Sequence, residues 1–235
     1  HLFVAMEYVE GQTLAQWMID HPRPTLDRVR AIIEQVAKGL QALHSREMLH
    51  QDIRPENIMI DSTGTVKIID LASAHVAGLA SSEREPSALE VAGTLQYTAP
   101  EYFVGHGGTA RSDLFSLAVV AYQMLTSQLP YGLQVSRSRS LADVGKLRYT
   151  PLRHFRPDLP AWLDAVLQKA LHANPAKRQQ VVSELSHDLQ SPGAEFHKAR
   201  PLPLIDRNPV IFWQCTTALL AAGVVMLLGL LTAGR

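Results

Sequence analysis

Cysteine is almost absent from this chain of 235 residues, which contains only Cys215. One thiol cannot form an intramolecular disulfide or a zinc site built from several cysteines, so both are excluded. None of the ten histidines has the paired spacing of a metal-binding motif such as H-E-x-x-H, which argues against a metal held by histidine. Neither sign of charge is in excess, because Lys and Arg together number 22 and Asp and Glu also number 22. No global field therefore draws nucleic acid to this protein, and no nucleic-acid partner is expected.

A signal peptide is not recognisable at the start of the chain either. The first residues read His-Leu-Phe-Val-Ala-Met and contain no basic region ahead of an apolar one. We therefore expect the chain to be part of a longer polypeptide.

The far end of the chain has a different composition. Residues 210–233 form a run of 24 residues without a charge. A helix of that length is about 36 Å long, and a hydrocarbon core is about 30 Å thick. Phe212 and Trp213 lie near one end, where aromatic rings favour the membrane interface. The run predicts a single transmembrane helix, because a buried core helix, the alternative, is usually shorter and amphipathic.

Charges around this run indicate its orientation. Lys198, Arg200 and Arg207 precede it, and Arg235 alone follows it. The positive-inside rule therefore predicts that the preceding domain lies in the cytoplasm. Residues 191–209 contain four prolines and little periodicity, so they are predicted to be a linker.

Apolar periodicity predicts a mixed α+β fold for the rest of the chain. The run at 2–8 is a strand candidate, and apolar residues spaced by three and four predict a long helix over 26–43, capped by Thr25 or Asp27. Short apolar runs at 57–60 and 66–69 flank Asp-Ser-Thr-Gly, which predicts a hairpin. Further helices are expected over 112–126 and 161–173.

Chemically active residue types gather around that hairpin. Residues 50–57 bring Asp52, Arg54 and Asn57 onto one loop, and Asp70 follows the second strand. Two carboxylates and an amide from the two sides of one hairpin suit a divalent cation with bound phosphates, because Mg²⁺ prefers oxygen ligands. Each residue alone would more often be a cap or a turn residue; their combination predicts a site.

Five segments resemble protein kinase motifs, in the order and at the spacing of that family. They are HQDIRPEN for the catalytic loop, DLA for the metal-binding D-F-G triplet, GTLQYTAPE for the end of the activation segment, SDLFSL in a helix, and NPAKR near the end of the domain. The resemblance covers residues 1–190. It implies an α+β, protein-kinase-like fold: a mostly α-helical C-lobe with a hinge strand and a catalytic-loop hairpin, the N-lobe largely missing, followed by one C-terminal transmembrane helix.

The resemblance also implies roles in the transfer of a phosphoryl group from ATP. Asp52 would accept the proton of the substrate hydroxyl, and Asn57 and Asp70 would hold Mg²⁺, or Mn²⁺ in its place. Arg54 stands where Ser/Thr kinases usually have lysine and would balance phosphoryl charge with a planar fork. Thr94 stands where Ser/Thr kinases have a threonine near the catalytic acid. Together with the Pro-Glu of the loop, this favours protein Ser/Thr hydroxyls as acceptors.

The same resemblance implies a nucleotide pocket. Residues 6–9 match the gatekeeper and hinge, with the backbone of Glu7 and Val9 facing the adenine. Met59 would form the apolar floor beneath the base.

Other matched residues are expected to be structural. Glu101 and Arg178 resemble the buried pair that fixes the activation segment to the helical lobe. Asp113 is expected to bind the backbone of the catalytic loop, and His50 is expected to pack and orient.

Three departures from the family pattern stand out. Gln51 replaces an arginine that normally receives an activation-loop phosphate, and Ala72 replaces a glycine, which restricts the backbone. The Gly-rich loop, the strand lysine and the partnering helix glutamate would all precede the hinge. Because the chain starts at the hinge, we expect it by itself to transfer phosphate inefficiently.

One subfamily is resembled more closely by the stretch YTAPEYFVGHGGTARSDLFSLAVVAYQMLT, by HQDIRPENIMID and by the C-terminal span. It is that of the bacterial bifunctional Ser/Thr kinase/phosphatase proteins, in which a PP2C-type phosphatase domain precedes the kinase. Two functions stay open: a membrane-tethered ATP-dependent Ser/Thr kinase, and a non-catalytic kinase-like docking module. A small-molecule phosphotransferase ranks last, because it would not need the GTLQYTAPE segment.

Overall fold

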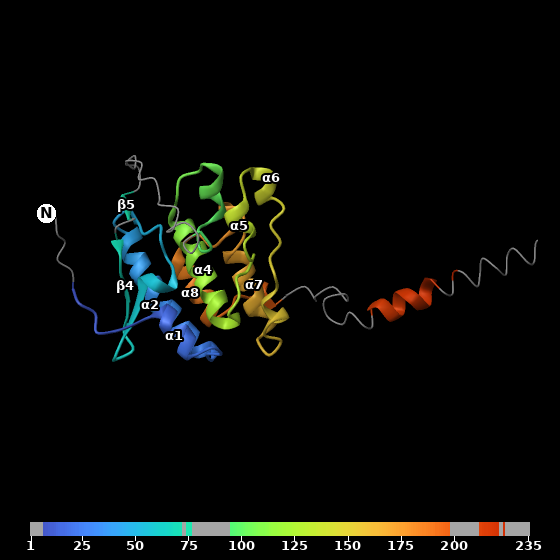
Figure 1. The fold of residues 1–235 in the computed structure, drawn as a ribbon, viewed down its shortest axis with the longest axis horizontal. Helices are drawn as coiled ribbons and strands as arrows, with labels where there is room; N and C mark the ends of the chain where they lie inside the picture. The colour runs from blue at the N-terminus through green and yellow to red at the C-terminus, as the bar shows by residue number, and fades with distance from the viewer. Residues whose placement is uncertain (1–6, 72–73, 77–94, 198–211, 221–222, 224–235) are drawn as a thin grey trace, which may run out of the picture. The chain divides into compact units, whose positions relative to one another are not determined.

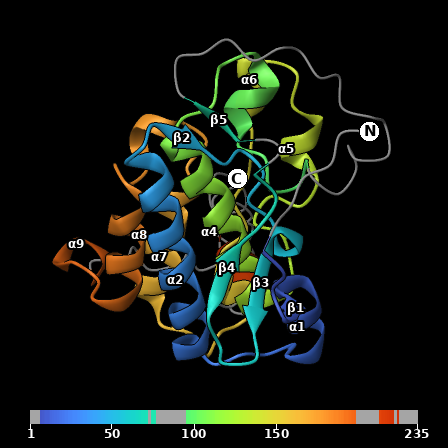
Figure 2. The same ribbon diagram turned by 90° about the vertical axis from the view of Figure 1, so that its left-hand side faces the viewer.

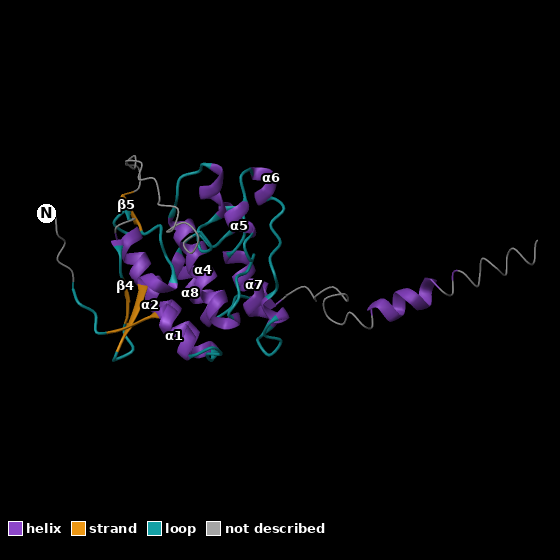
Figure 3. Ribbon diagram, in the orientation of Figure 1, coloured by secondary structure: helices purple, strands orange, loops and turns teal. Residues whose placement is uncertain are grey.

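The computed structural model describes residues 7–71, 74–76, 95–197, 212–220 and 223 (Figure 1). Residues 1–197 form one compact unit and residues 198–235 a second. The first unit is mostly helical with a small sheet, as Figure 3 shows by colour. This agrees with the predicted α+β class.

Two long helices form the core of the first unit. Helix α2, Leu26–His44, begins where the hydroxyl of Thr25 accepts a hydrogen bond from the amide of Arg28, and its apolar face is buried. Helix α4, Ala110–Thr126, is buried along nearly its whole length and packs against α2. Helices α7, Ala161–Ala170, and α8, Val182–Gln190, pack against α4. The predictions of helices over 26–43 and 112–126 are confirmed; the third helix ends at Ala170 instead of 173.

Three short antiparallel strands form the sheet that carries the predicted hairpin. Strand β3, Ile58–Asp61, pairs with β4, Val66–Ile68, on one side and with β1, Gly11–Thr13, on the other. Figure 2 shows this sheet with α2 running alongside β4. The hairpin prediction is therefore confirmed.

The predicted strand over 2–8 is corrected. Residues 2–6 lie outside the described part of the chain, residues 7–10 have no regular structure, and the strand is Gly11–Thr13. A Cβ atom at Gly11 would lie 2.2 Å from the carbonyl oxygen of Ile60. Only glycine allows this close pairing with β3, so the strand begins at Gly11, beyond the predicted run.

Several shorter elements were not predicted. Helix α1, Leu14–Asp20, follows β1 directly and is capped by Thr13. The others are β2 (Met48–Leu49), β5 (His75–Val76), α5 (Gln134–Arg137), α6 (Leu141–Val144), α9 (Ala194–His197), and the 3₁₀ helices η1 (Pro55–Asn57), η3 (Pro100–Val104), η4 (Leu152–His154) and η5 (Pro175–Lys177).

The end of the first unit extends into the predicted linker. Helix α9 lies within residues 191–209, and its Phe196 is buried with the ammonium of Lys169 5.1 Å from the ring centroid. The rest of that predicted linker, 198–209, falls outside the described residues. In the second unit, residues 212–220 are helical. The described part of the chain contains no helix with the length and apolar character needed to cross a membrane, and most of the predicted span at 210–233 lies beyond it.

Candidate active site

The catalytic loop is held in place by one buried carboxylate. Asp113, at the start of α4, accepts hydrogen bonds from the backbone amides of His50 (2.9 Å) and Gln51 (2.8 Å). Gln51 has a φ of 67°, in the left-handed region that costs a non-glycine residue about 1–3 kcal/mol. These two bonds compensate for the cost of that conformation and fix the backbone immediately before Asp52. The predicted role of Asp113 is confirmed.

A third donor to Asp113 was missed by sequence reasoning. The Nε2 atom of His44, in the last turn of α2, donates to the Asp113 carboxylate at 2.8 Å, and both side chains are buried. The carboxylate therefore joins α2, α4 and the catalytic loop. A histidine in the last turn of a helix is a common capping signal, so the sequence did not distinguish this residue.

Asp52 and Asn57 are in direct contact. The amide nitrogen Nδ2 of Asn57 donates to the Asp52 carboxylate (2.7 Å) and to the Asp52 carbonyl (2.9 Å). Because Nδ2 makes both bonds, the amide oxygen Oδ1 is the Asn57 atom suited to a cation. Helix η1 turns the chain between the two residues, which places Asn57 at the start of β3.

Asp70 is brought to the same place by the hairpin. The amide of Ile69 donates to the carbonyl of Asn57 at 2.9 Å, and the buried ring of His50 donates through Nε2 to the Ile69 carbonyl at 3.2 Å. Asp70 has a φ of 61°, a second left-handed residue at this site. The ring of His50 therefore orients the segment, as predicted.

The assembled donors fit a hard divalent cation. Asp52, Asn57 and Asp70 all present oxygen atoms, and Mg²⁺ is commonly held by one or two carboxylates together with waters and phosphates. Within the described residues there is no group of three or more His, Cys, Asp and Glu side chains able to hold a metal by themselves. The donor set thus suits a cation that arrives with a phosphate-bearing substrate.

Arg54 provides the positive charge of the loop. Its Nε donates to Glu56 at 2.8 Å, and this bond raises the pKa of Arg54 above its ordinary value. Tyr97 lies close enough for the Glu56 charge to act on it. Burial, assisted by that charge, raises the pKa of Tyr97 to about 12, so its hydroxyl stays protonated and donates to Gln123 at 2.7 Å.

The predicted hinge is joined to the sheet. The Glu7 carboxylate pairs with the ammonium of Lys67 on β4, and Met59 lies between Thr13 and Lys67 in the strand register. Val9 is half-buried in the segment leading to β1. The structure thus brings Glu7 next to the strands that carry Met59, but Thr94 and Met6 lie outside the described residues.

The buried ion pair is confirmed. Arg178 donates to both carboxylate oxygens of Glu101, at 2.8 and 2.7 Å, and its side chain is fully buried. The guanidinium also donates to the carbonyls of Arg111 and His172 and lies 4.7 Å from the ring centroid of Phe115. The pair joins η3, at the end of the GTLQYTAPE segment, to the segment before α8.

Comparisons with known proteins agree with this geometry. The family model described as "Protein kinase domain" matches residues 1–189. The serine/threonine-protein kinase PknB of Mycobacterium tuberculosis is 38% identical over 192 residues, covering 80% of this chain and 30% of PknB. PrkC of Bacillus subtilis is 27% identical over 193 residues, 80% of this chain and 28% of PrkC.

PknA of Corynebacterium glutamicum is 33% identical over 180 residues, which is 75% of this chain and 36% of that protein. The chain therefore spans about a third of the length of these curated relatives. The relatives are all serine/threonine-protein kinases, and the matched family model together with the catalytic-loop geometry leads to one conclusion: the chain belongs to the protein kinase domain family.

Proposed function

We propose that this protein is an ATP-dependent kinase that transfers the γ-phosphoryl group to serine and threonine hydroxyls of proteins. The observation that carries the proposal is the contact between Asp52 and Asn57, with Asp70 joined to them through the Ile69 backbone. An acid, an amide and a second acid at one point are the parts that kinase chemistry uses for a proton and for metal-bound phosphates.

In this proposal Asp52 receives the proton of the attacking hydroxyl. The bond from Asn57 fixes the Asp52 carboxylate, so that its second oxygen stays available to the substrate. Arg54 balances charge on the transferring group, and its pairing with Glu56 limits where its guanidinium reaches. Thr94 is proposed to lie near Asp52 and to favour Ser/Thr acceptors.

Asn57 and Asp70 are proposed to hold Mg²⁺, or Mn²⁺ in its place. When bound, the ion would neutralise charge on the nucleotide phosphates. The backbone of Glu7 and Val9 and the side chain of Met59 are proposed to contact the adenine.

The wider organisation is proposed on the sequence alone. It comprises a kinase domain at 1–190, a linker at 191–209 and a transmembrane helix at 210–233 that tethers the kinase to the cytoplasmic face of a bacterial inner membrane. A PP2C-type phosphatase domain upstream in the natural protein, the mark of the bifunctional subfamily, likewise stays a prediction.

Phosphate transfer from labelled ATP to a generic Ser/Thr protein, with Mg²⁺ present, tests the function. The natural protein is compared with its Asp52→Asn variant, which keeps the size of the side chain but removes the base. We expect the substitution to lower kcat by about 10²–10⁴-fold, the usual contribution of a positioned acid or base. A Glu47→Gln variant, altered at an exposed turn residue, serves as the control.

The alternative, a non-catalytic docking module, makes the opposite prediction. It requires that the natural protein neither transfers phosphate nor binds ATP, and that Asp52→Asn changes neither property. That result would overturn the catalytic proposal.

A further inference from the structure

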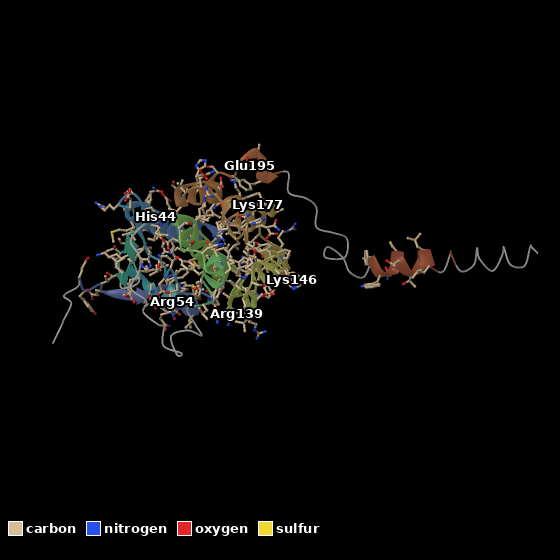
Figure 4. The ribbon with its side chains drawn as sticks, turned by 90° about the horizontal axis from the view of Figure 1, so that it is seen from above. His44, Arg54, Arg139, Lys146, Lys177 and Glu195 are labelled. Carbon is tan, nitrogen blue, oxygen red and sulfur yellow. The ribbon has the colours of Figure 1, made fainter. Side chains whose placement is uncertain are left out.

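The segment around α5 and α6 has a local charge that the whole chain lacks. Between Tyr131 and Tyr149 it contains four cations, Arg137, Arg139, Lys146 and Arg148, and one acid, Asp143, although the formal net charge of the chain is zero. All four cations are exposed. Figure 4 labels Arg139 and Lys146 toward the same edge of the kinase unit. We call these four residues the basic rim.

The basic rim is not neutralised within the described part of the chain, although the Arg139 guanidinium donates to the uncharged backbone carbonyls of Ser136 and Ser138. None of its four cations forms an ion pair with a described residue. Asp143 accepts hydrogen bonds from the Ser140 hydroxyl and the Arg139 amide, which lower the pKa of this acid. Asp143 is therefore a charged residue of α6 held by its neighbours Ser140 and Arg139, and the rim keeps an excess of positive charge.

A cavity of about 630 Å³ lies directly beside the basic rim. The volume falls within the 300–1,000 Å³ that binding pockets usually have. Its apolar wall is formed by four aliphatic and two aromatic residues: Val104, Leu141, Val144, Leu147, Tyr131 and Tyr149. Leu141 is 66% exposed, so the cavity opens onto a hydrophobic edge.

The two tyrosine hydroxyls and the glutamate carboxylate around the cavity have partners elsewhere. The hydroxyl of Tyr131 donates to the carbonyl of Leu171 and that of Tyr149 to Asp164, so the two rings line the cavity as apolar surfaces. The Glu101 carboxylate is paired with Arg178. Burial and the nearby cations lower the pKa of His172, which keeps this lining residue neutral at pH 7. These four side chains therefore present no free charge to an apolar group in the cavity.

The basic rim and the cavity adjoin through Leu147. This residue lines the large cavity and also a smaller one, of about 240 Å³, to which Arg137 and Lys146 contribute. The amide of Arg148 donates to Gln134 in that smaller cavity, and the amide of Lys146 donates to the carbonyl of Asp143. An extended group seated in the large cavity would therefore meet the rim within a few residues.

We propose that this face is a docking surface for an acidic protein segment that carries a bulky apolar anchor. The anchor would fill the cavity between η3 and α6, while the flanking carboxylates meet the basic rim. Buried aromatic or aliphatic anchors supply most of the energy of such contacts, and rim charges mainly steer association and select partners. The surface ends beside the η3 helix, at the end of the activation segment. The inference rests on the proposed function in one respect, namely that such a partner would be a protein substrate.

A nucleic acid or an anionic lipid surface would also be attracted by the rim. Neither requires a deep apolar cavity beside the charges, however, so an acidic segment with an anchor matches more of what the surface offers. The two alternatives are separated from it by removing the anchor.

Fluorescence anisotropy tests the proposal with the natural protein and a labelled peptide in which Trp and Leu are flanked by Asp and Glu. The peptide contains no Ser or Thr and no ATP is added, so the result is independent of phosphate transfer. We expect binding that weakens with salt. Replacing the peptide's Trp and Leu by Gly should weaken it about 10- to 100-fold, from the loss of one or two buried apolar side chains.

Variants locate the binding on this face. Arg137→Glu with Lys146→Glu should weaken binding at least about tenfold, whereas Arg28→Glu with Arg46→Glu, which changes two exposed cations on α2 and beyond its end, should change it less than about twofold. Val144→Trp should fill the cavity and abolish the advantage of the anchor, while Leu133→Trp, exposed on the same segment but outside the cavity lining, should not. Circular dichroism melting confirms that each variant is folded.

Three results would overturn the proposal. They are no binding by the natural protein, equal loss with the two pairs of charge reversals, or equal affinity for the peptide without its anchor. Equal affinity without the anchor, joined by comparable binding to anionic vesicles or single-stranded DNA, would indicate a general polyanion surface instead. If the natural protein binds the peptide but transfers no phosphate, the proposed function would be contradicted and the docking surface would still be supported.

Discussion

The catalytic loop and the α5–α6 segment differ in whether their charged side chains are paired. At the loop, polar side chains are bonded to one another or to the backbone: Asp113 of α4 accepts three hydrogen bonds, and Asn57 donates to Asp52. In the α5–α6 segment, Arg137 and Lys146 turn outward and pair with no described residue. A buried charged group fixes the position of a site, because leaving it without its partner is costly. An exposed and unpaired cation stays available to another molecule.

The largest expected effect comes from a buried cation. Replacing Arg178 with Met leaves the Glu101 carboxylate buried without its partner, which should lower the free energy of unfolding by about 3–5 kcal/mol. Lys38→Met removes the partner of Glu34 in an exposed pair on α2 and should cost no more than about 1 kcal/mol. Urea unfolding of the two variants measures both values. Similar losses for the two would show that burial does not separate these pairs.

A smaller effect is expected at the anchor of the catalytic loop. Asp113→Asn replaces one acceptor oxygen with a donor that faces the amide of either His50 or Gln51, and should cost about 1–3 kcal/mol of unfolding free energy. If Asp113 positions Asp52, kcat should fall more than the KM for ATP changes. The matched variant Asp143→Asn, in the α5–α6 segment, should stay within about 0.5 kcal/mol of the parent protein. Unchanged kcat in a folded Asp113→Asn variant would contradict the positioning role.

The smallest effect concerns pH. Burial, with Lys177 and Arg178 nearby, lowers the pKa of His172 in the folded protein, so the unfolded chain binds its proton first as the pH falls. The stability that neutral His172 contributes is therefore present above its unfolded pKa, about 6.5, and is lost as the pH falls through the lower folded value. His172→Gln should flatten the decline in Tm between pH 7 and pH 5 by about a degree or two. A parallel decline in both proteins would show that His172 is not responsible.

Local patterns predicted the elements whose signal is local. Helix α2 has a cap at Thr25 and an apolar face that recurs through more than four turns, and the hairpin has its turn residues between two apolar runs. Helix α1 was missed because seven residues with two buried positions, Leu14 and Trp17, give no clear period. Strand β1 was misplaced because its position depends on its pairing with β3, where Gln12 lies opposite Ile60, a residue 48 positions further along the chain.

Motif order and spacing were enough to identify Asp52, Asn57 and Asp70 as the candidate chemical groups, because each is tied to a short loop or a strand end. Which charges are paired depends on the fold. His44 meets Asp113 across 69 residues and Arg178 meets Glu101 across 77, whereas the basic rim forms no ion pair within the described residues. The physical reason is that a residue type fixes what a side chain can donate or accept, while burial and the arrival of distant elements fix whether it does.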